Sequence, residues 1–247
     1  MLNQFSRTKR VLGERAMGAL FGKVVAIFGL GGVGGNACDA LARSGVRHFV
    51  LIDNDEVTVT NINRQLIATL ETVGRSKVDV MEEHIHAIDP TIILEKRNVF
   101  YLPENAEEFD FAQYDYVVDA IDTVSAKIDI ISRCHALNVP VISALGCGNK
   151  VEPTFLAVAD LYETTYDPLA KVLRRELRKR GVERLKVVYS KEPPLTPLDE
   201  PTEGEREEPS RGKRAVPGST AFVPPVAGII IASEVVKDLT QFDRENR

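Results

Sequence analysis

The stretch from Lys23 to Asp53 opens with an apolar run, Lys23-Val24-Val25-Ala26-Ile27-Phe28, which ends in the glycine-rich turn Gly29-Leu30-Gly31-Gly32-Val33-Gly34. A helical pattern follows, and a second apolar run then leads into Asp53. Strand, glycine turn, helix, strand and acid, in this order, are the signature of a dinucleotide-binding βαβ unit. The sequence therefore predicts a nucleotide site at this turn, with a purely structural turn as the alternative.

The glycines of this turn have separate uses. Gly29 permits the tight turn, Gly31 lets backbone N–H groups approach a phosphate, and Gly34 lets the helix lie close to the sheet. The N-terminus of that helix supplies unpaired donors and a positive dipole end to an anion. Asp53, at the end of the second strand, is placed to hydrogen-bond ribose hydroxyls.

The residues after Asp53 favour a triphosphate over a nicotinamide. Arg64 and Lys77 are two cations suited to phosphate oxygens, and a dehydrogenase needs a flat apolar slot instead. Farther along, an apolar strand delivers Asp122 to its carboxyl end, where ligands bind in open α/β sheets. An acid in that position can hold Mg²⁺ against phosphate oxygens.

The strand–helix alternation continues to about residue 144 and predicts a Rossmann-like, doubly wound α/β fold with a mostly parallel sheet. The C-terminal helix is too short and too charged to span a bilayer, so we expect it on the core or at a dimer interface. We divide the chain into an N-terminal helical arm (1–22), a nucleotide-binding core (23–165), a basic helix and strand (166–192), an acidic proline-rich linker (193–217) and a C-terminal helical segment (218–247).

Composition sets further bounds. The chain has 247 residues, 44% of them hydrophobic, which is enough for one large core, and its net charge of −5 argues against nucleic-acid binding by bulk electrostatics. The three cysteines form no C-x-x-C pair, which favours a reducing compartment over a structural zinc site. No signal peptide is readable, so we expect a cytoplasmic protein. Cys38 and Cys134 fall in predicted helices, and only Cys147, in a glycine turn, is a candidate for a chemical role.

A basic segment follows the core. Asp167 and Pro168 are an N-cap and a first-turn proline, and the chain from Lys171 to Lys191 then carries nine Lys or Arg residues against two acids. Such a run is usually a solvated face, but its concentration in an acidic protein favours a contact with a phosphate backbone. The candidate contacts are Lys171, Arg174, Arg175, Arg178 and Lys179.

The motifs together resemble the E1-like adenylating enzymes, a superfamily that includes ubiquitin-activating enzymes and adenylases of molybdopterin and thiamine biosynthesis. The resemblance is carried, in order and spacing, by the glycine turn, Asp53-Asn54-Asp55, Asn61-Ile62-Asn63-Arg64-Gln65, Gly74-Arg75-Ser76-Lys77 and Asp119-Ala120-Ile121-Asp122.

This resemblance implies ATP as cofactor, with Asp53 as ribose contact and Asp122 as Mg²⁺ ligand. Phosphate contacts are implied at Asn61, Arg64 and Lys77, and the same ATP site takes in Gly29, Gly31, Gly32, Gly34, Asp55 and Gln65. Catalysis is then expected from Arg64, Lys77 and Asp122. It also implies a homodimer in which an N-terminal arginine reaches the partner's ATP site, with Arg10 as the candidate and Arg7 as the alternative.

Further segments are similar to one branch, the tRNA threonylcarbamoyladenosine dehydratases, over nearly the full length. These segments are Phe5 to Gly13, Val158 to Leu161, Asp167 to Ala170 and Val188 to Ser190. The similarity implies an ATP-dependent enzyme that adenylates the threonyl carboxylate of threonylcarbamoyladenosine in the tRNA anticodon loop and cyclises it. The absence of cysteine beyond Cys147 argues against a thiol relay and leaves a sulfur-transfer partner protein undefined.

Three other functions stay open on the sequence. The first is adenylation of the C-terminal carboxylate of a ubiquitin-like sulfur carrier, which the basic helix and the missing zinc pairs disfavour. An NAD-dependent oxidoreductase would use Asp53 and leave Arg64 and Lys77 without a purpose. The third is a non-catalytic nucleotide-sensing or tRNA-binding protein. The loop from Gly146 to Thr154 is expected either to face the reactive end of the nucleotide or to be a hairpin connection.

Overall fold

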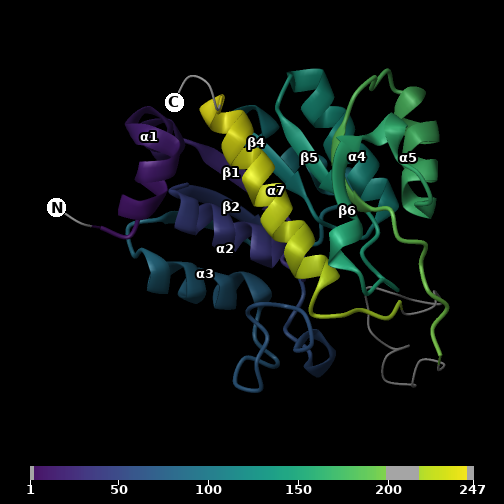
Figure 1. The fold of residues 1–247 in the computed structure, drawn as a ribbon, viewed down its shortest axis with the longest axis horizontal. Coiled ribbons are helices and arrows are strands. Elements are labelled where there is room, and N and C mark those ends of the chain that lie inside the picture. Colours follow the sequence, from purple (N-terminus) through teal and green to yellow (C-terminus); the bar gives the residue numbers. More distant parts are fainter. Residues whose placement is uncertain (1–2, 199–216, 244–247) are drawn as a thin grey trace.

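A computed structural model describes residues 3–198 and 217–243 of the chain. One seven-stranded sheet forms its centre, in the order β3-β2-β1-β4-β5-β7-β6 (Figure 1). Every neighbouring pair is parallel except β6 with β7, so the predicted doubly wound, mostly parallel α/β fold is confirmed. The strands are β1 Val24–Phe28, β2 His48–Ile52, β3 Ile93–Arg97, β4 Tyr116–Asp119, β5 Val141–Ala144, β6 Leu156–Asp160 and β7 Lys186–Ser190.

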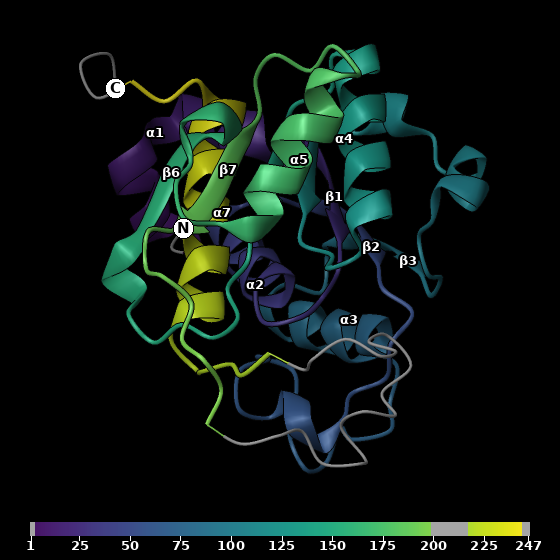
Figure 2. The ribbon, with the colours of Figure 1, turned by 90° about the vertical axis from the view of Figure 1, so that its right-hand side faces the viewer.

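Two layers of helices enclose this sheet, because alternate residues of each strand point to opposite faces. Helices α1, α2, α3 and α7 share a core with one face of β1 and β2, and α4 packs on the other face beside α5 (Figure 2). The central strands are buried on both sides, which explains their continuous apolar runs. The helices are α1 Ser6–Phe21, α2 Gly34–Ser44, α3 Lys77–Ile88, α4 Val124–Leu137, α5 Pro168–Arg178 and α7 Val223–Thr240.

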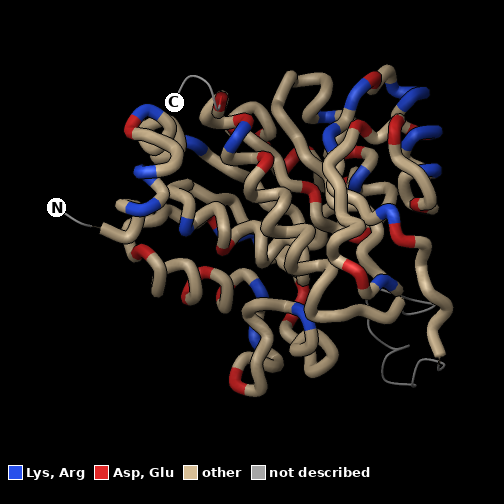
Figure 3. The backbone as a smooth tube through the Cα atoms, in the orientation of Figure 1, with Lys and Arg blue, Asp and Glu red and all other residues tan. Residues whose placement is uncertain are grey.

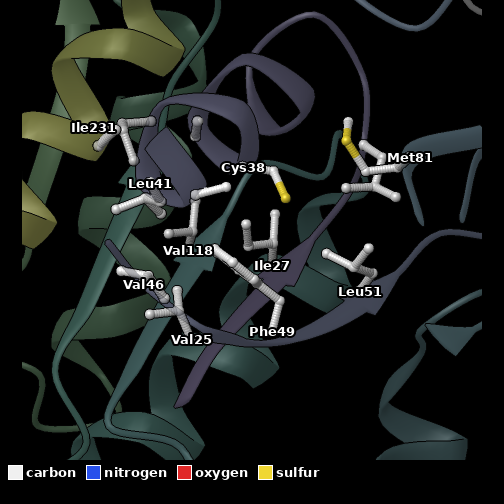
Figure 4. Packing of buried hydrophobic residues seen from close by; sticks show 14 of the residues in the cluster. Val25, Ile27, Cys38, Leu41, Val46, Phe49, Leu51, Met81, Val118 and Ile231 are labelled. Carbon is white, nitrogen blue, oxygen red and sulfur yellow. The ribbon is translucent and has the colours of Figure 1, made fainter. Parts of the chain in front are cut away.

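The larger core lies between the sheet and α2. Ile27 and Phe49 on the strands meet Cys38 and Leu41 on α2, and Ile231 reaches the same cluster from α7 (Figure 4). All five side chains are fully buried. Cys38 therefore packs as a small hydrophobe, as predicted, and so does Cys134 in the core on the opposite face.

The connection from β3 to β4 contains no α-helix. Two 3₁₀ helices, Pro103–Glu108 and Phe111–Gln113, lie in this connection. Tyr101, Phe109 and Phe111, in and beside these helices, gather around Phe28, whose ring centroid lies 5.0 Å from that of Tyr101. This aromatic cluster fixes the chain just after β3, at the carboxyl edge of the sheet.

Helix α7, yellow in Figure 1, crosses one face of the sheet and packs on α2. Near its end, the Tyr116 hydroxyl donates a hydrogen bond of 2.7 Å to Asp238 and ties the helix to β4. No helix in the described ranges 3–198 and 217–243 is both long and apolar enough to cross a membrane. Residues 199–216, most of the predicted acidic linker, lie outside the described residues.

Candidate nucleotide-binding site

A cavity of about 570 Å³ opens at the carboxyl ends of the central strands. It lies where the sheet order reverses between β1 and β4, which is where ligands bind in doubly wound folds. Most of the nucleotide contacts predicted from the sequence line it: Gly29, Gly31, Gly32, Asp53, Asp55, Asn61, Arg64, Gln65, Lys77 and Asp122. Gly34 and Arg10, also predicted, are not part of its lining.

The glycine turn is built as its sequence predicts. Gly29 has φ +90°, and a Cβ atom there would lie 2.7 Å from the Ala120 carbonyl oxygen. A Cβ atom on Gly34 would lie 1.8 Å from the Gly29 carbonyl oxygen, so Gly34 permits the close packing of the turn on α2. The absence of side chains at both positions leaves the glycine turn and Val33, the N-cap of α2, at the cavity wall.

Asp53 braces this turn from the end of β2. Its Oδ2 accepts the Leu30 N–H at 2.6 Å, and its Oδ1 accepts the Asp55 N–H at 2.8 Å. Burial raises the pKa of the Asp53 carboxyl, and the nearby Lys77 charge opposes that shift. Because each carboxylate oxygen has a second lone pair, Asp53 can brace the turn and still accept a hydroxyl donor from the cavity.

The two predicted cations stand in different surroundings. The Lys77 side chain is only 6% exposed, and its Nζ lies 2.7 Å from Asp55 Oδ2 and 4.0 Å from Asp53 Oδ1. Arg64 is partly buried, and its Nη1 donates to the Thr60 carbonyl at 2.9 Å. Lys77 therefore brings a positive charge into the cavity with Asp55 as its counter-ion.

Amide side chains complete this wall. Asn61 is buried, and its Oδ1 accepts the Thr58 N–H at 3.2 Å, which stabilises the turn that leads to Arg64. Gln65 is also buried, and its Oε1 has no hydrogen-bond partner among the described residues. A buried polar atom without a partner is rare in proteins, so Gln65 offers an acceptor to a ligand in the cavity.

Asp122 lies on the turn that joins β4 to α4. It is exposed, and within the described ranges no hydrogen bond or ion pair engages its side chain. The described residues contain no group of three or more His, Cys, Asp or Glu side chains that could hold a metal ion. Mg²⁺ is commonly bound by one or two carboxylates together with substrate phosphates, so this donor set fits a Mg²⁺ ion carried by a nucleotide.

Two parts of the cavity wall escape sequence reasoning. The first is an apolar wall formed by the segment Val99–Tyr101 after β3 together with Ile121. The only sign of this wall in the sequence is a pair of aromatic residues in an extended stretch. The second is Pro217–Ser219, next to Gly148 of the loop that the sequence predicts either at the reactive end of the nucleotide or as a hairpin. Because β5 pairs with β7 and not with β6, the loop after Gly146 is no hairpin, and it borders the cavity.

The sequence model of the ThiF family matches residues 5–247. The chain belongs to the ThiF family. This confirms the resemblance to E1-like adenylating enzymes that the motifs indicate.

Among other ThiF-family proteins, the tRNA threonylcarbamoyladenosine dehydratase of Bacillus subtilis is 42% identical over 242 residues, covering 97% of this chain and 95% of that protein. The protein of the same name from Escherichia coli is 39% identical over 175 residues, covering 71% of this chain and 65% of that protein. Crystal structures of that E. coli enzyme, TcdA, superpose with TM-scores of 0.84 for the complex with ATP and 0.85 for the complex with AMP. Both are 32% identical and cover 96% of this chain and 94% of the other.

Cys147 borders the cavity of this ThiF-family chain but is not a ready nucleophile. Its side chain is partly buried, and burial raises the pKa of its thiol to about 12. A thiol with that pKa is protonated at neutral pH, and the thiolate is the reactive form.

The predicted basic helix is present as α5, which carries several Lys and Arg residues (Figure 3). The Asp167 side chain accepts the Ala170 N–H as N-cap. Its cations are not equivalent. Arg174 points inward, where its Nη1 donates to the Thr164 carbonyl at 3.1 Å and also to the Thr164 hydroxyl. The Arg178 guanidinium lies 5.0 Å from the centre of the Tyr162 ring.

Three further cations surround one acid on this helix. Arg175, Lys179 and Arg180 all pair with Glu176 and lower the pKa of its carboxyl to about 2. Because three positive charges meet one negative charge, the exposed face of α5 remains basic.

Arg10 lies on α1, away from the cavity of its own chain. It is exposed, and its side chain makes no ion pair in the part of the chain that the structure describes. Helix α1 is interrupted at Gly13, where φ is +85°.

Proposed function

We propose that this chain is an ATP-dependent tRNA threonylcarbamoyladenosine dehydratase. It adenylates the threonyl carboxylate of threonylcarbamoyladenosine in the tRNA anticodon loop and then cyclises it, with release of pyrophosphate and AMP. One observation carries the proposal: the cavity joins the glycine turn, Lys77, Arg64 and Asp122 in a chain that is 42% identical, almost end to end, to a dehydratase of that name. The crystal structures of the E. coli enzyme with ATP and AMP support the choice of nucleotide.

The lining of the cavity favours one orientation of bound ATP. The apolar wall of Val99–Tyr101 and Ile121 suits the adenine ring, and Asp53 accepts from the ribose. The phosphates then extend along the glycine turn toward Lys77 and Arg64, with the N-terminus of α2 behind them. The loop Gly146–Gly148 borders the space left for the substrate carboxylate.

Adenylation is the step that these residues serve. A carboxylate is a poor electrophile, and its attack on the α-phosphorus of ATP yields an acyl adenylate and pyrophosphate. Lys77 and Arg64 hold the phosphate oxygens and stabilise the charge that develops, which is the main contribution a protein makes to phosphoryl transfer. Asp122 would hold a Mg²⁺ ion, which neutralises charge on the leaving pyrophosphate when bound.

Cyclisation needs no nucleophile from the protein. A carbamoyl nitrogen or neighbouring group of the substrate attacks the activated acyl carbon and displaces AMP. The cavity holds the two reacting groups of one molecule together, which replaces a bimolecular encounter. The raised pKa of the Cys147 thiol agrees with a reaction without a thioester.

The exposed face of α5 is the proposed tRNA contact. Lys171, Arg175, Arg178 and Lys179 present positive charge outward, whereas Arg174 braces the helix through Thr164. Leu169, in the first turn of α5, lines the cavity, so a tRNA backbone on this helix lies beside the reaction site. The absence of C-x-x-C pairs favours a reducing compartment, and a cytoplasmic location is part of the proposal.

The activity test uses tRNA carrying threonylcarbamoyladenosine with ATP and Mg²⁺. We expect AMP release and a modified nucleoside lighter by one water, measured by mass spectrometry after digestion. The control is the same tRNA without the threonylcarbamoyl group. AMP formation driven by a carrier protein with a C-terminal di-glycine, and not by the tRNA, would replace this function with carrier adenylation.

A homodimer with Arg10 acting in the partner's site is also part of the proposal. Arg10→Ala and Lys77→Met are each expected to be inactive alone. If Arg10 acts in the other subunit, subunits mixed and reassembled at equal amounts regain about a quarter of the activity, because half of the dimers carry one complete site. Recovery with Arg7→Ala in place of Arg10→Ala would assign the role to Arg7.

A further inference from the structure

At the wall of the cavity lies a buried polar cluster that the proposed reaction leaves unexplained, and one of its members, Lys127, lines the cavity. It consists of Asp119 at the end of β4, Lys127 in the first turn of α4, and Ser143 on β5. Lys127 Nζ lies 2.9 Å from Asp119 Oδ2 and 3.2 Å from Ser143 Oγ, and the Ser143 hydroxyl donates to the same Asp119 oxygen at 2.6 Å. Lys127 is 1% exposed, and Asp119 and Ser143 are fully buried.

The Asp119–Lys127–Ser143 cluster is not the most stable filling for this space. A buried ion pair loses the hydration of both charges, and apolar residues of similar volume are often at least as stabilising. Asp119 Oδ1 is buried and has no hydrogen-bond partner among the described residues, which adds to the cost. A charged cluster kept in such a place is better explained by the geometry that it imposes than by stability.

The cluster imposes its geometry on the turn Ala120–Thr123. This turn joins Asp119 to α4, and the Lys127–Asp119 pair ties its two flanks together. At one end, the Ala120 N–H donates to the Phe28 carbonyl at 2.8 Å, and at the other the Lys127 N–H donates to the Thr123 carbonyl at 3.0 Å.

Asp122 is the exposed residue of this closed turn. Its side chain has no hydrogen bond or ion pair within the described ranges, so the backbone of the turn is what restrains the position of the carboxylate. The contacts of the Asp119–Lys127–Ser143 cluster, which hold the turn in place, therefore help to fix the position of Asp122.

We propose that Lys127 is a positioning residue for Asp122. Through Asp119 and Ser143 it fixes the turn Ala120–Thr123, so that the Asp122 carboxylate is held at the place where the metal ion of the nucleotide binds. The inference rests on the role of Asp122 in the proposed function. Lys127 lines the cavity, but two of its three ammonium donors are bonded to Asp119 and Ser143, which directs its side chain to the cluster.

Metal binding can be measured without the reaction. Mn²⁺ is titrated by electron paramagnetic resonance into protein saturated with α,β-methylene-ATP, and nucleotide affinity is measured separately in EDTA by calorimetry. The principal variant combines Asp119→Leu, Lys127→Met and Ser143→Ala, which removes every polar group of the cluster together and leaves no buried charge unpaired. Ser143→Ala alone is the mild variant, because it removes one donor and keeps the ion pair.

We expect the triple variant to bind the nucleotide in EDTA like the parent and to bind Mn²⁺ about 10-fold more weakly, in the range seen when groups behind a metal ligand are changed. Ser143→Ala is expected to weaken Mn²⁺ binding by about 2- to 4-fold on the same grounds. The control is Lys23→Met, which removes the 2.8 Å ion pair between Lys23 and Asp115. These residues directly precede β1 and β4, at the amino ends of the strands and away from the cavity, so this variant is expected to bind Mn²⁺ like the parent.

Two outcomes overturn the inference. Parental Mn²⁺ affinity in Ser143→Ala and in a folded triple variant shows that the cluster does not position the ligand. Parental affinity in Asp122→Asn shows that there is no carboxylate ligand to position. A wild-type protein that binds Mn²⁺ as expected but forms no cyclised nucleoside contradicts the proposed reaction and leaves the role of Lys127 intact.

Discussion

At the scale of the residue, the cavity concentrates charge that the fold must hold in place. Lys77 is nearly buried between two carboxylates, and Asp53 accepts one hydrogen bond from the glycine turn at Leu30 and another from the Asp55 N–H. Asp55 is 39% exposed, so solvent shares in stabilising its charge. A ligand phosphate can therefore take over Lys77 from Asp55 at little cost, because the Asp55 carboxylate remains solvated.

Replacing Lys77 tests this balance. Lys77→Met keeps the length of the side chain and removes its charge, so we expect AMP formation to fall at least about 100-fold, as for the loss of a preorganised electrostatic contact. The measurement is single-turnover AMP release at saturating ATP. Arg75→Met is the matched control: Arg75 pairs with Glu83 on the outside of α3 and does not line the cavity, so parental rates are expected. Equal losses in both variants would show a general effect on this loop.

Cys147 makes a second prediction at this scale, from its pKa of about 12. At pH 8 the thiolate is about one part in ten thousand, so alkylation by iodoacetamide should be slow and should rise about tenfold per pH unit. Cys147→Ser should keep AMP formation within about threefold of the parent, because no thiolate takes part. Rapid labelling at pH 7 together with an inactive serine variant would restore a thiol mechanism.

At the scale of the element, α5 combines a buried apolar side with an exposed cationic one. Leu173 and Leu177 are fully buried, whereas Lys171, Arg175 and Arg178 are exposed. The helix therefore holds its place through apolar packing and leaves most of its charge available.

Neutralising that exposed face separates tRNA binding from ATP binding. The double variant Lys171→Gln, Arg178→Gln should raise the KM for tRNA about 5- to 10-fold. The slope of log affinity against log salt concentration should fall by the amount expected for the loss of about one to two phosphate contacts. The ATP affinity should not change, because neither residue lines the cavity. Arg75→Gln is the control, because Arg75 is an exposed arginine just before α3. An unaltered KM and salt slope would make this face an ordinary solvated surface.

At the scale of the whole molecule, the chain closes on itself through α7. This helix packs on α2, whose N-cap residue Val33 lines the cavity, although the two helices are far apart in the sequence. The contact is close: a Cβ atom on Gly228 would lie 2.2 Å from the Val33 carbonyl oxygen. Helix α7 thus supports the glycine turn of the nucleotide site.

A side chain at Gly228 should force these helices apart. We expect Gly228→Ala to lower the free energy of unfolding by about 1 to 3 kcal/mol, as for an overpacked core, and to weaken ATP binding through the displaced turn. Gly18→Ala on α1 is the control, because no atom lies within 4 Å of its Cβ position, and it should stabilise by up to about 1 kcal/mol. Urea unfolding and calorimetry measure the two effects, and equal stability changes in the two variants would contradict the close contact.

The local sequence determined the elements and the polar residues at their ends. Strand periodicity, the glycine turn and the Asp167–Pro168 helix start depend on neighbours in the chain. The doubly wound sheet could therefore be predicted, and most of the predicted nucleotide contacts line the cavity. The function assigned to these residues, by contrast, stays a proposal.

Only the tertiary structure decided which side chains share an environment, because burial and pairing depend on residues distant in the sequence. It turned Arg174 inward to Thr164, gave Lys77 a counter-ion, and assembled Asp119, Lys127 and Ser143 from three elements. No local pattern distinguishes Lys127 from a solvated lysine on α4. Its burial follows from the packing of α4 on the carboxyl ends of β4 and β5.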